Sequence, residues 1–179
     1  MDNLLSHEGR ELARLIVFAG LPASGKSTIA RQVAAKTGAV WLRIDAMDQA
    51  IWASGTAPAD LHDWTYRAAQ ALASDNLALG HDVIADCVND WQAARDGWQD
   101  AAGRVGAQVV WLEIVCSDAA EHRRRVETRT SDIPGLALPS WEAVSARDYH
   151  AWDRDHFSID TAHKTIAECV KAALTTLER

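Results

Sequence analysis

Apolar and polar positions follow one another along the chain in blocks that predict a mixed α/β fold. Five short runs are apolar without alternation, which is typical of parallel strands covered by helices on both faces. Segments with helical spacing of apolar residues lie between and after these runs. The expected strands are residues 14–19, 39–44, 82–85, 107–115 and 157–160. The pattern therefore predicts a doubly wound α/β domain.

Two of the expected helices have apolar positions that share one face at helical spacing. These positions are Leu61, Trp64, Ala68 and Leu72 in the first helix and Ile166, Val170, Ala173 and Leu177 in the second. We expect both faces to pack against the sheet.

The stretch GLPASGKST, residues 20–28, lies between the first expected strand and a helix. It fits the pattern GxxxxGK followed by Ser or Thr, in which glycines let backbone N–H groups approach phosphate oxygens. The lysine can reach the β- and γ-phosphates, and the serine hydroxyl can bind Mg²⁺. The residues expected to wrap a triphosphate are Gly20, Ala23, Ser24, Gly25, Lys26, Ser27 and Thr28.

Carboxylates follow the second and third expected strands, at the sheet edge where ligands of open α/β folds bind. Asp45 is the candidate for orienting or deprotonating an acceptor hydroxyl, although it could instead cap a helix. Asp86 is the candidate for the magnesium shell or for the acceptor. Asn89 is explained more simply as the cap of the next helix.

An arginine-rich helix follows the fourth expected strand. Arg125 and Arg129 fall on the face that approaches the proline-containing loop 130–141, and guanidinium groups can embrace phosphoryl oxygens. We expect a lid over about residues 125–142. The alternative is a solvated helix in which these arginines pair with glutamates.

Two of the eight tryptophans, Trp52 and Trp64, fall where an acceptor pocket is expected. Stacking on a flat or sugar-like substrate is one interpretation. Core packing is the favoured one, because large aromatic residues dominate interiors.

Charge and cysteine usage narrow the class of partner. The net charge of −7 argues against binding long nucleic acid or an anionic membrane surface. Three widely spaced cysteines indicate neither a disulfide framework nor a zinc site. With no apolar run of membrane-spanning length, we expect a cytoplasmic protein with a single domain over residues 1–179, as a monomer or homodimer.

Across most of its length the chain resembles the small P-loop phosphotransferases of the adenylate-kinase-like group. Among them are ATP-binding proteins related to zeta toxins, chloramphenicol phosphotransferase, gluconate kinase and adenylyl-sulfate kinase. The similarity runs from FAGLPASGKST through LRIDAMDQAI, VIADCVND and VCSDAAEHRRRVETR to DYHAWDRDHFSIDTA. The first motif is the most specific.

This resemblance implies a five-stranded parallel sheet in the order 2-3-1-4-5, with ATP and Mg²⁺ as donor and cofactor. It implies that Asp160 and Thr161 lie near the adenine, that Asp45 is the acceptor-side carboxylate, and that Arg125 or Arg129 is a lid arginine. Many relatives have an arginine where this chain has Asp48. That difference favours a neutral or cationic acceptor over an anionic one.

The expected function is transfer of the γ-phosphate of ATP to a hydroxyl of a small molecule. Two alternatives stay open. The first is a nucleotide-binding regulator or weak ATPase without an acceptor. The second is a toxin-like kinase that acts on a nucleotide-sugar or on a polynucleotide 5′-hydroxyl.

Overall fold

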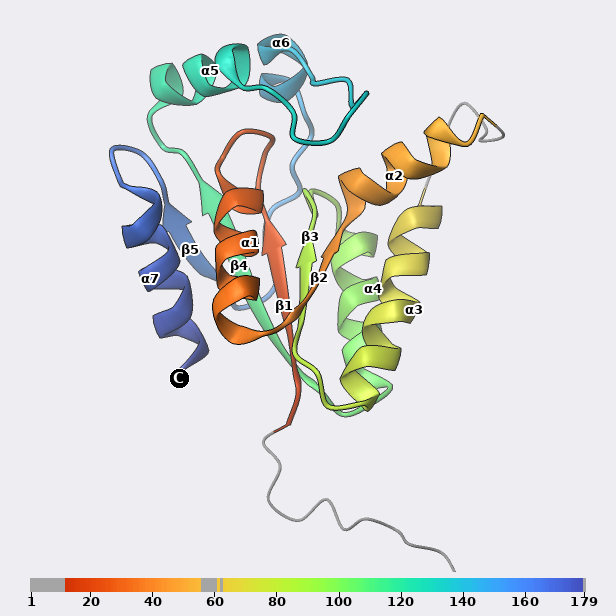
Figure 1. Ribbon diagram of the computed structural model, residues 1–179. Helices are drawn as coiled ribbons and strands as arrows, with labels where there is room; N and C mark the ends of the chain where they lie inside the picture. Colours follow the sequence, from red (N-terminus) through yellow and green to blue (C-terminus); the bar gives the residue numbers. More distant parts are fainter. Residues whose placement is uncertain (1–11, 56–60, 62, 179) are drawn as a thin grey trace, which may run out of the picture.

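The computed structural model describes residues 12–55, 61 and 63–178, and it contains one five-stranded sheet (Figure 1). The strands are β1 (Arg14–Ala19), β2 (Val40–Arg43), β3 (Val83–Asp86), β4 (Gln108–Val115) and β5 (Phe157–Asp160). Every neighbouring pair is parallel, and the order is β2-β3-β1-β4-β5. Both the strand positions and the order expected from the sequence are confirmed.

Helices cover both faces of this sheet. Because side chains alternate along a strand, Leu15 and Val17 of β1 pack in one layer while Ile16 and Phe18 pack in the other. The first layer is closed by α3 (Trp64–Ala78) and α4 (Gln92–Gly103), and the second by α1 (Lys26–Thr37) and α7 (Ile166–Leu177). The fold is thus a three-layer α/β sandwich.

The remaining helices lie beyond the carboxyl ends of the strands (Figure 1). They are α2 (Ile44–Ala53), α5 (Ala119–Thr128) and α6 (Trp141–Ser145). The loop between α5 and α6 reaches toward α2 above the turn that follows β1. These elements surround the edge where a ligand of this fold class is expected.

The expected buried face of α3 is wrong. Trp64 is 55% exposed and Leu72 is 46% exposed, although Leu61, which precedes the helix, is buried. The buried stripe is instead Thr65, Tyr66, Ala69, Ala73 and Leu77. Tyr66, Ala69, Ala73 and Leu77 pack in the layer beneath the helix, and Trp64 and Leu72 face outward.

The buried face expected for α7 is confirmed for three of its four residues. Val170 and Ala173 are buried and Leu177 packs against the same layer, whereas Ile166, in the first turn, is 38% exposed. Thr165 begins this helix with a capping box that it forms with Glu168.

Asn89 is not the cap of α4, whose N-cap is Trp91. Its backbone has a φ of 53°, and its buried side chain donates to the Phe18 carbonyl (2.8 Å) and accepts from Trp98 Nε1 (2.9 Å). Both ends of the amide are therefore used to join β1, the end of β3 and α4. Asn89 has a structural role.

A buried arginine fixes the segment between α6 and β5. Arg95 on α4 is fully buried, and its guanidinium donates to the carbonyls of Asn89, His150 and Ala151, each at 2.9 Å. Its guanidinium carbon lies 4.2 Å from the ring centre of Trp152. Backbone carbonyls and an aromatic face thus take the place of a carboxylate partner.

Two further expectations concern membrane-spanning segments and the positions of Trp52 and Trp64. Within the described ranges no helix combines the length and apolarity that crossing a bilayer requires. Trp52 is 44% exposed and Trp64 is 55% exposed, so the expectation that they pack in the core is wrong.

Candidate active site

The turn after β1 has a backbone that only particular residues can adopt. Gly20 has a φ of 136°, and a Cβ on it would lie 2.1 Å from the Ile114 carbonyl oxygen, so no side chain fits. Ala23 and Gly25 also have positive φ, 66° and 102°, and Gly25 is the N-cap of α1. The turn therefore ends at a helix N-terminus, where unpaired N–H groups and the helix dipole favour an anion.

A cavity of about 660 Å³ opens beside this turn. Most of its lining comes from three groups of residues: the turn and the start of α1, the end of β2 with α2, and the segment from α5 to α6. Among the residues that line it are Ala23, Gly25, Lys26, Ser27, Thr28, Arg43, Asp45, Asp48, Tyr66, Trp91, Arg125, Arg129, Asp132, Leu136, Pro139 and Arg147. The volume suits a ligand of nucleotide size or larger.

Asp86 is only 2% exposed and contacts Ser27 and Arg43, which line this cavity. One carboxylate oxygen accepts a hydrogen bond from the Ser27 hydroxyl (3.0 Å) and the other from Trp41 Nε1 (3.2 Å). Burial raises the pKa of Asp86, while the charge of Lys26 and the bond from Ser27 act in the opposite direction. A hydroxyl and a carboxylate on adjacent elements are oxygen donors of the kind that Mg²⁺ prefers.

Asp45 lies in the first turn of α2 and lines the cavity. The N-cap of this helix is Arg43, and α2 has no side-chain capping bond, so Asp45 does not act as a cap. Over the described residues Asp45 has no hydrogen bond or ion pair, whereas Asp48 accepts a hydrogen bond from the Thr65 hydroxyl. Burial raises the pKa of Asp48, and the negative charge of Asp45 adds to that shift.

The two arginines expected in a lid, Arg125 and Arg129, have different surroundings. The Arg125 guanidinium pairs with Glu121 and donates to the hydroxyl (2.8 Å) and carbonyl (2.9 Å) of Thr161. Arg129 is the C-cap of α5, and within the described ranges its buried Nε has no hydrogen-bond partner. Burial lowers the pKa of Arg129, and the charge of Asp45 across the cavity opposes this effect. Arg129 therefore has donors free for an anion, and Arg125 has few.

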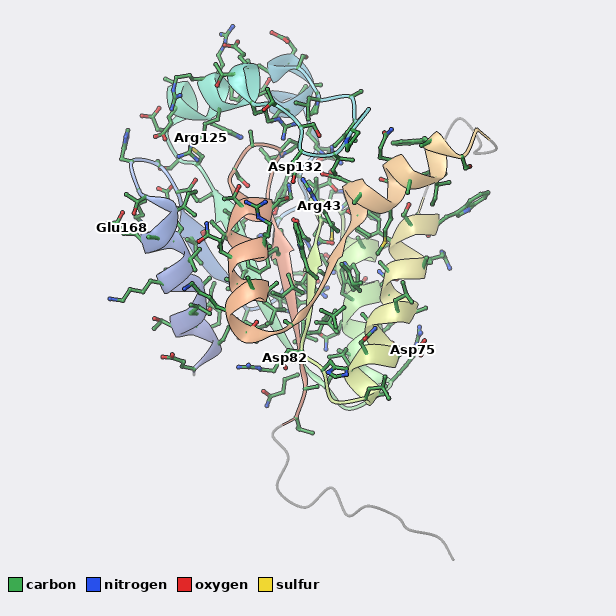
Figure 2. All side chains as sticks on the ribbon, in the orientation of Figure 1. Arg43, Asp75, Asp82, Arg125, Asp132 and Glu168 are labelled. Carbon is green, nitrogen blue, oxygen red and sulfur yellow. The ribbon has the colours of Figure 1, made fainter. Side chains whose placement is uncertain are left out.

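Arg43, which the sequence reasoning missed, ties the end of β2 to the loop after α5. Its guanidinium donates two hydrogen bonds to the Asp132 carboxylate, both at 2.9 Å (Figure 2). Its Nε lies 3.9 Å from Asp86. The position of Arg43 at the carboxyl end of a strand was a signal that could have identified it.

Asp160 and Thr161 do not line the main cavity. Asp160 accepts hydrogen bonds from the Ser117 hydroxyl (2.5 Å) and from the backbone N–H groups of Ser117 and Ala162. The Thr161 hydroxyl lies 2.8 Å from the Ser24 carbonyl, behind the phosphate turn. Both side chains brace the elements around the turn.

The sequence reasoning also missed three other lining residues. Tyr66 and Trp91 line the cavity and pack edge to face, with ring centres 4.6 Å apart. Arg147 lines it from the segment after α6 and pairs with the buried carboxylate of Asp90. Trp52 and Trp64 do not line this cavity. The missed residues lie far apart in the sequence, and only the fold brings them together.

Several solved structures with a similar fold are kinases. A sugar kinase from Janibacter sp. HTCC2649 has a TM-score of 0.67 and 22% identity, covering 93% of this chain and 95% of the other. A gluconokinase from Sinorhizobium meliloti has a TM-score of 0.66 and 19% identity, covering 95% and 94%. The APS kinase of Mycobacterium tuberculosis in complex with AMPPNP and APS has a TM-score of 0.70 and 16% identity, covering 93% and 98%.

The comparison with families is more specific. A search of curated proteins gave no match. The family model described as AAA domain matches residues 15–140, which include the turn after β1, Asp45, Asp86, Arg125 and Arg129. Since this match spans well over half of the chain, the chain belongs to the AAA domain family, and its fold is that of the P-loop kinases.

Proposed function

We propose that this protein is a kinase that transfers the γ-phosphate of ATP to a hydroxyl group of a small molecule. The observation that carries the proposal is one cavity that holds both halves of such a site. Lys26, Ser27 and the N-terminus of α1 form the half for a polyphosphate. Asp45, whose carboxylate has no partner among the described residues, lies in the half for an acceptor.

The residues divide the work of the reaction between them. Asp45 holds the acceptor hydroxyl and takes its proton as the oxygen attacks the γ-phosphorus. The bond between the γ-phosphorus and the oxygen that bridges it to the β-phosphate breaks, and ADP leaves with that oxygen. Lys26 and Arg129 stabilise the negative charge on the transferring group. Positioning and electrostatics supply most of the rate enhancement in such transfers.

The oxygen donors around Asp86 fit a magnesium ion brought in with ATP. Ser27 would hold the ion, and Asp86, which already accepts from the Ser27 hydroxyl, would hold its water shell. When bound, Mg²⁺ would neutralise charge on the β- and γ-phosphates. The buried setting of Asp86 is consistent with a carboxylate that gains a positive neighbour when the site is filled.

The nucleotide half of the proposal is tested with Lys26→Ala. Its matched control is Lys36→Ala, which removes an exposed lysine from the last turn of the same helix. Titration calorimetry with Mg²⁺ and AMPPNP should show binding to the wild type and to the control, and much weaker binding to Lys26→Ala. Equal heats for all three proteins would refute the assignment.

The acceptor half is tested with labelled ATP and pooled sugars, sugar acids, amino alcohols and nucleosides. Transfer to one of these by the wild type should fall by about 10²- to 10⁴-fold in Asp45→Asn, which is the range of general-base contributions. Asp75→Asn, on the exposed side of α3, is the control. A protein that binds ATP and labels none of the pools would instead be a nucleotide-binding regulator.

A further inference from the structure

A second cavity, of about 250 Å³, lies behind the phosphate turn. It shares no lining residue with the main cavity among the described residues. Its walls are Gly20, Leu21 and Ser24 of the turn, residues 113–116 at the end of β4, His122 of α5 and Tyr149 after α6. The reaction proposed above uses no side chain that faces this space.

Two hydroxyl groups in the wall of this cavity lack a hydrogen bond of normal geometry. Ser24 is 1% exposed, and its buried Oγ has no hydrogen-bond partner within the described ranges. The Oη of Tyr149 is also buried; the Glu113 carboxylate interacts with it, but without a hydrogen bond of normal geometry. Buried polar groups are nearly always satisfied, by protein, water or a ligand. The pair therefore indicates that something polar occupies this space.

The charges that line the second cavity limit which kind of ligand can bind there. Glu113 carries the wall's negative charge; it accepts from Trp152 Nε1 (2.7 Å) and has His156 Nε2 at 3.5 Å. No lysine or arginine is among the described lining residues. Burial, together with the nearby charge of Glu113, raises the pKa of Tyr149, so its hydroxyl remains a donor. An anion such as a phosphate is disfavoured here, and a neutral hydroxyl compound is favoured.

The volume of the second cavity and its apolar lining further limit which ligand it can bind. The wall includes Leu21, Ile114 and Val115. A dry cavity of about 150 Å³ lined by apolar side chains is large enough for benzene, so this one admits a single ring with a polar substituent. Ligand pockets for larger molecules are usually above about 300 Å³.

A chain of hydrogen bonds joins this cavity to the main one. The Ser24 carbonyl lies 2.8 Å from the Thr161 hydroxyl, and Arg125, which lines the main cavity, donates to that hydroxyl. His122, in the wall of the second cavity, lies 2.9 Å from the Pro22 carbonyl through its Nε2. An occupant that bonds Ser24 would therefore restrict the turn that receives the nucleotide.

We propose that the second cavity binds one small neutral molecule, a single ring or a chain of similar size that carries a hydroxyl group, and that this binding strengthens ATP binding. The hydroxyl of the ligand bonds Ser24 and Tyr149, and its apolar part packs on Leu21, Ile114 and Val115. Binding of the ligand in the second cavity does not depend on the proposed kinase function. The effect on ATP rests on the proposed kinase function.

Cys116 gives a direct measure of occupancy. It lines the cavity and is partly exposed, whereas Cys87 and Cys169, the other two cysteines of the chain, are buried. Burial raises the pKa of the Cys116 thiol, so alkylation is followed at alkaline pH, which increases the fraction of thiolate. Intact-mass measurement of iodoacetamide labelling then reports on this one site.

Phenol is the probe, with toluene and benzoate as controls for the hydroxyl and for charge. Millimolar phenol should slow Cys116 labelling about fivefold or more, toluene should protect less, and benzoate not at all. Tyr149→Phe keeps the ring and removes one hydroxyl, so it should lose most of the protection by phenol. Equal labelling rates with and without phenol would overturn the proposal. So would equal protection by phenol in Tyr149→Phe, or crystals grown with phenol that hold only ordered water on the two hydroxyls.

The coupling is measured separately, by AMPPNP titration with and without phenol. Phenol should tighten AMPPNP binding about fivefold in the wild type, within the usual range of coupling between sites, and much less in Tyr149→Phe. Protection of Cys116 without any change in AMPPNP affinity would overturn the coupling. Absence of AMPPNP binding in either condition would refute the kinase proposal and leave the labelling result to decide the cavity.

Discussion

Arg125 and Arg129 lie one helical turn apart on α5 and its cap, yet their partners give them different roles. Arg125 forms an ion pair with Glu121 and donates hydrogen bonds to both oxygens of Thr161, so its guanidinium is already bound within the fold. Arg129 lines the cavity, its buried Nε has no hydrogen-bond partner in the part of the chain that the structure describes, and Asp45 is its electrostatic neighbour. The sequence places both arginines on one face, and only the contacts distinguish them.

This difference predicts that replacement by glutamine lowers activity at Arg129 and lowers stability at Arg125. Arg129→Gln should lower phosphate transfer by about 10²- to 10³-fold, because it removes charge from the transferring group, and should leave the free energy of unfolding nearly unchanged. Arg125→Gln should cost about 1–3 kcal/mol of stability, because Glu121 and Thr161 lose their partner. Steady-state kinetics and urea unfolding of both variants measure the two effects. An Arg129→Gln enzyme with full activity would contradict the assigned role.

Asp160 gives a prediction about pH. Hydrogen bonds from the Ser117 hydroxyl and from the N–H groups of Ala162 and Ser117 hold the pKa of Asp160 at about 2, below its usual 3.8. The ionised form is the one stabilised in the fold. This stabilisation is therefore complete above about pH 4 and is lost as the pH falls toward 2.

Asp160→Asn should consequently be less stable than the wild type by about 1–2 kcal/mol at pH 7, with allowance for solvent screening. The difference should narrow as the pH is lowered from 4 to 2. Urea unfolding curves across this range measure it, with Asp75→Asn, on the exposed side of α3, as the control. A difference that does not depend on pH would mean that the Asp160 charge contributes nothing.

At the scale of elements, the ends of strands and helices decide where the site residues lie. The loop between α5 and α6, residues 129–140, is tied to the end of β2 by Arg43 and Asp132 (Figure 2). Because 60% of the Asp132 side chain is exposed, this ion pair adds only about 0–1 kcal/mol to overall stability. Its effect is on the position of the loop over the cavity.

Asp132→Asn should therefore loosen the loop without unfolding the protein. Trypsin cleavage after Arg129 should become faster by about two- to fivefold, because local opening precedes proteolysis. The melting temperature should stay within about 1 °C of the wild type, since a weak exposed pair is lost. Glu127→Gln, which removes an exposed ion pair with Arg123 on α5, is the control. Unchanged cleavage would show that the pair does not hold the loop.

At the scale of the whole molecule, nucleotide binding should stabilise the fold. The turn between β1 and α1 that would hold the nucleotide exists only in the folded chain, so the ligand binds the folded state and not the unfolded one. A ligand at 100 times its Kd adds about 2.7 kcal/mol to the free energy of unfolding. For a chain of 179 residues this corresponds to a rise of about 5–10 °C in melting temperature. We expect this rise with Mg²⁺ and AMPPNP together.

Scanning calorimetry of the full chain checks the prediction. The rise should shrink when EDTA is added, and Lys26→Ala should lose most of it. An equal rise in Lys26→Ala would place the nucleotide elsewhere. The oligomeric state expected from the sequence, a monomer or homodimer, is measured in the same samples by light scattering.

The local pattern of the sequence determined much of this protein. Strand positions followed from apolar runs, because parallel strands are buried on both faces. The phosphate turn followed from fixed glycines, because Gly20 and Gly25 hold backbone angles that other residues rarely adopt. Asp45 and Asp86 were identified as candidates because strand ends meet at one edge of a parallel sheet.

The tertiary structure alone decided which side chains have partners. Packing against the sheet decided the buried face of α3, in which Ala69 and Ala73 are fully buried. Arg43 gained its role from Asp132, 89 positions away in the sequence, and the cavity behind the turn arises where the turn, β4 and Tyr149 meet. Such contacts depend on packing between distant segments, and local periodicity carries no information about them.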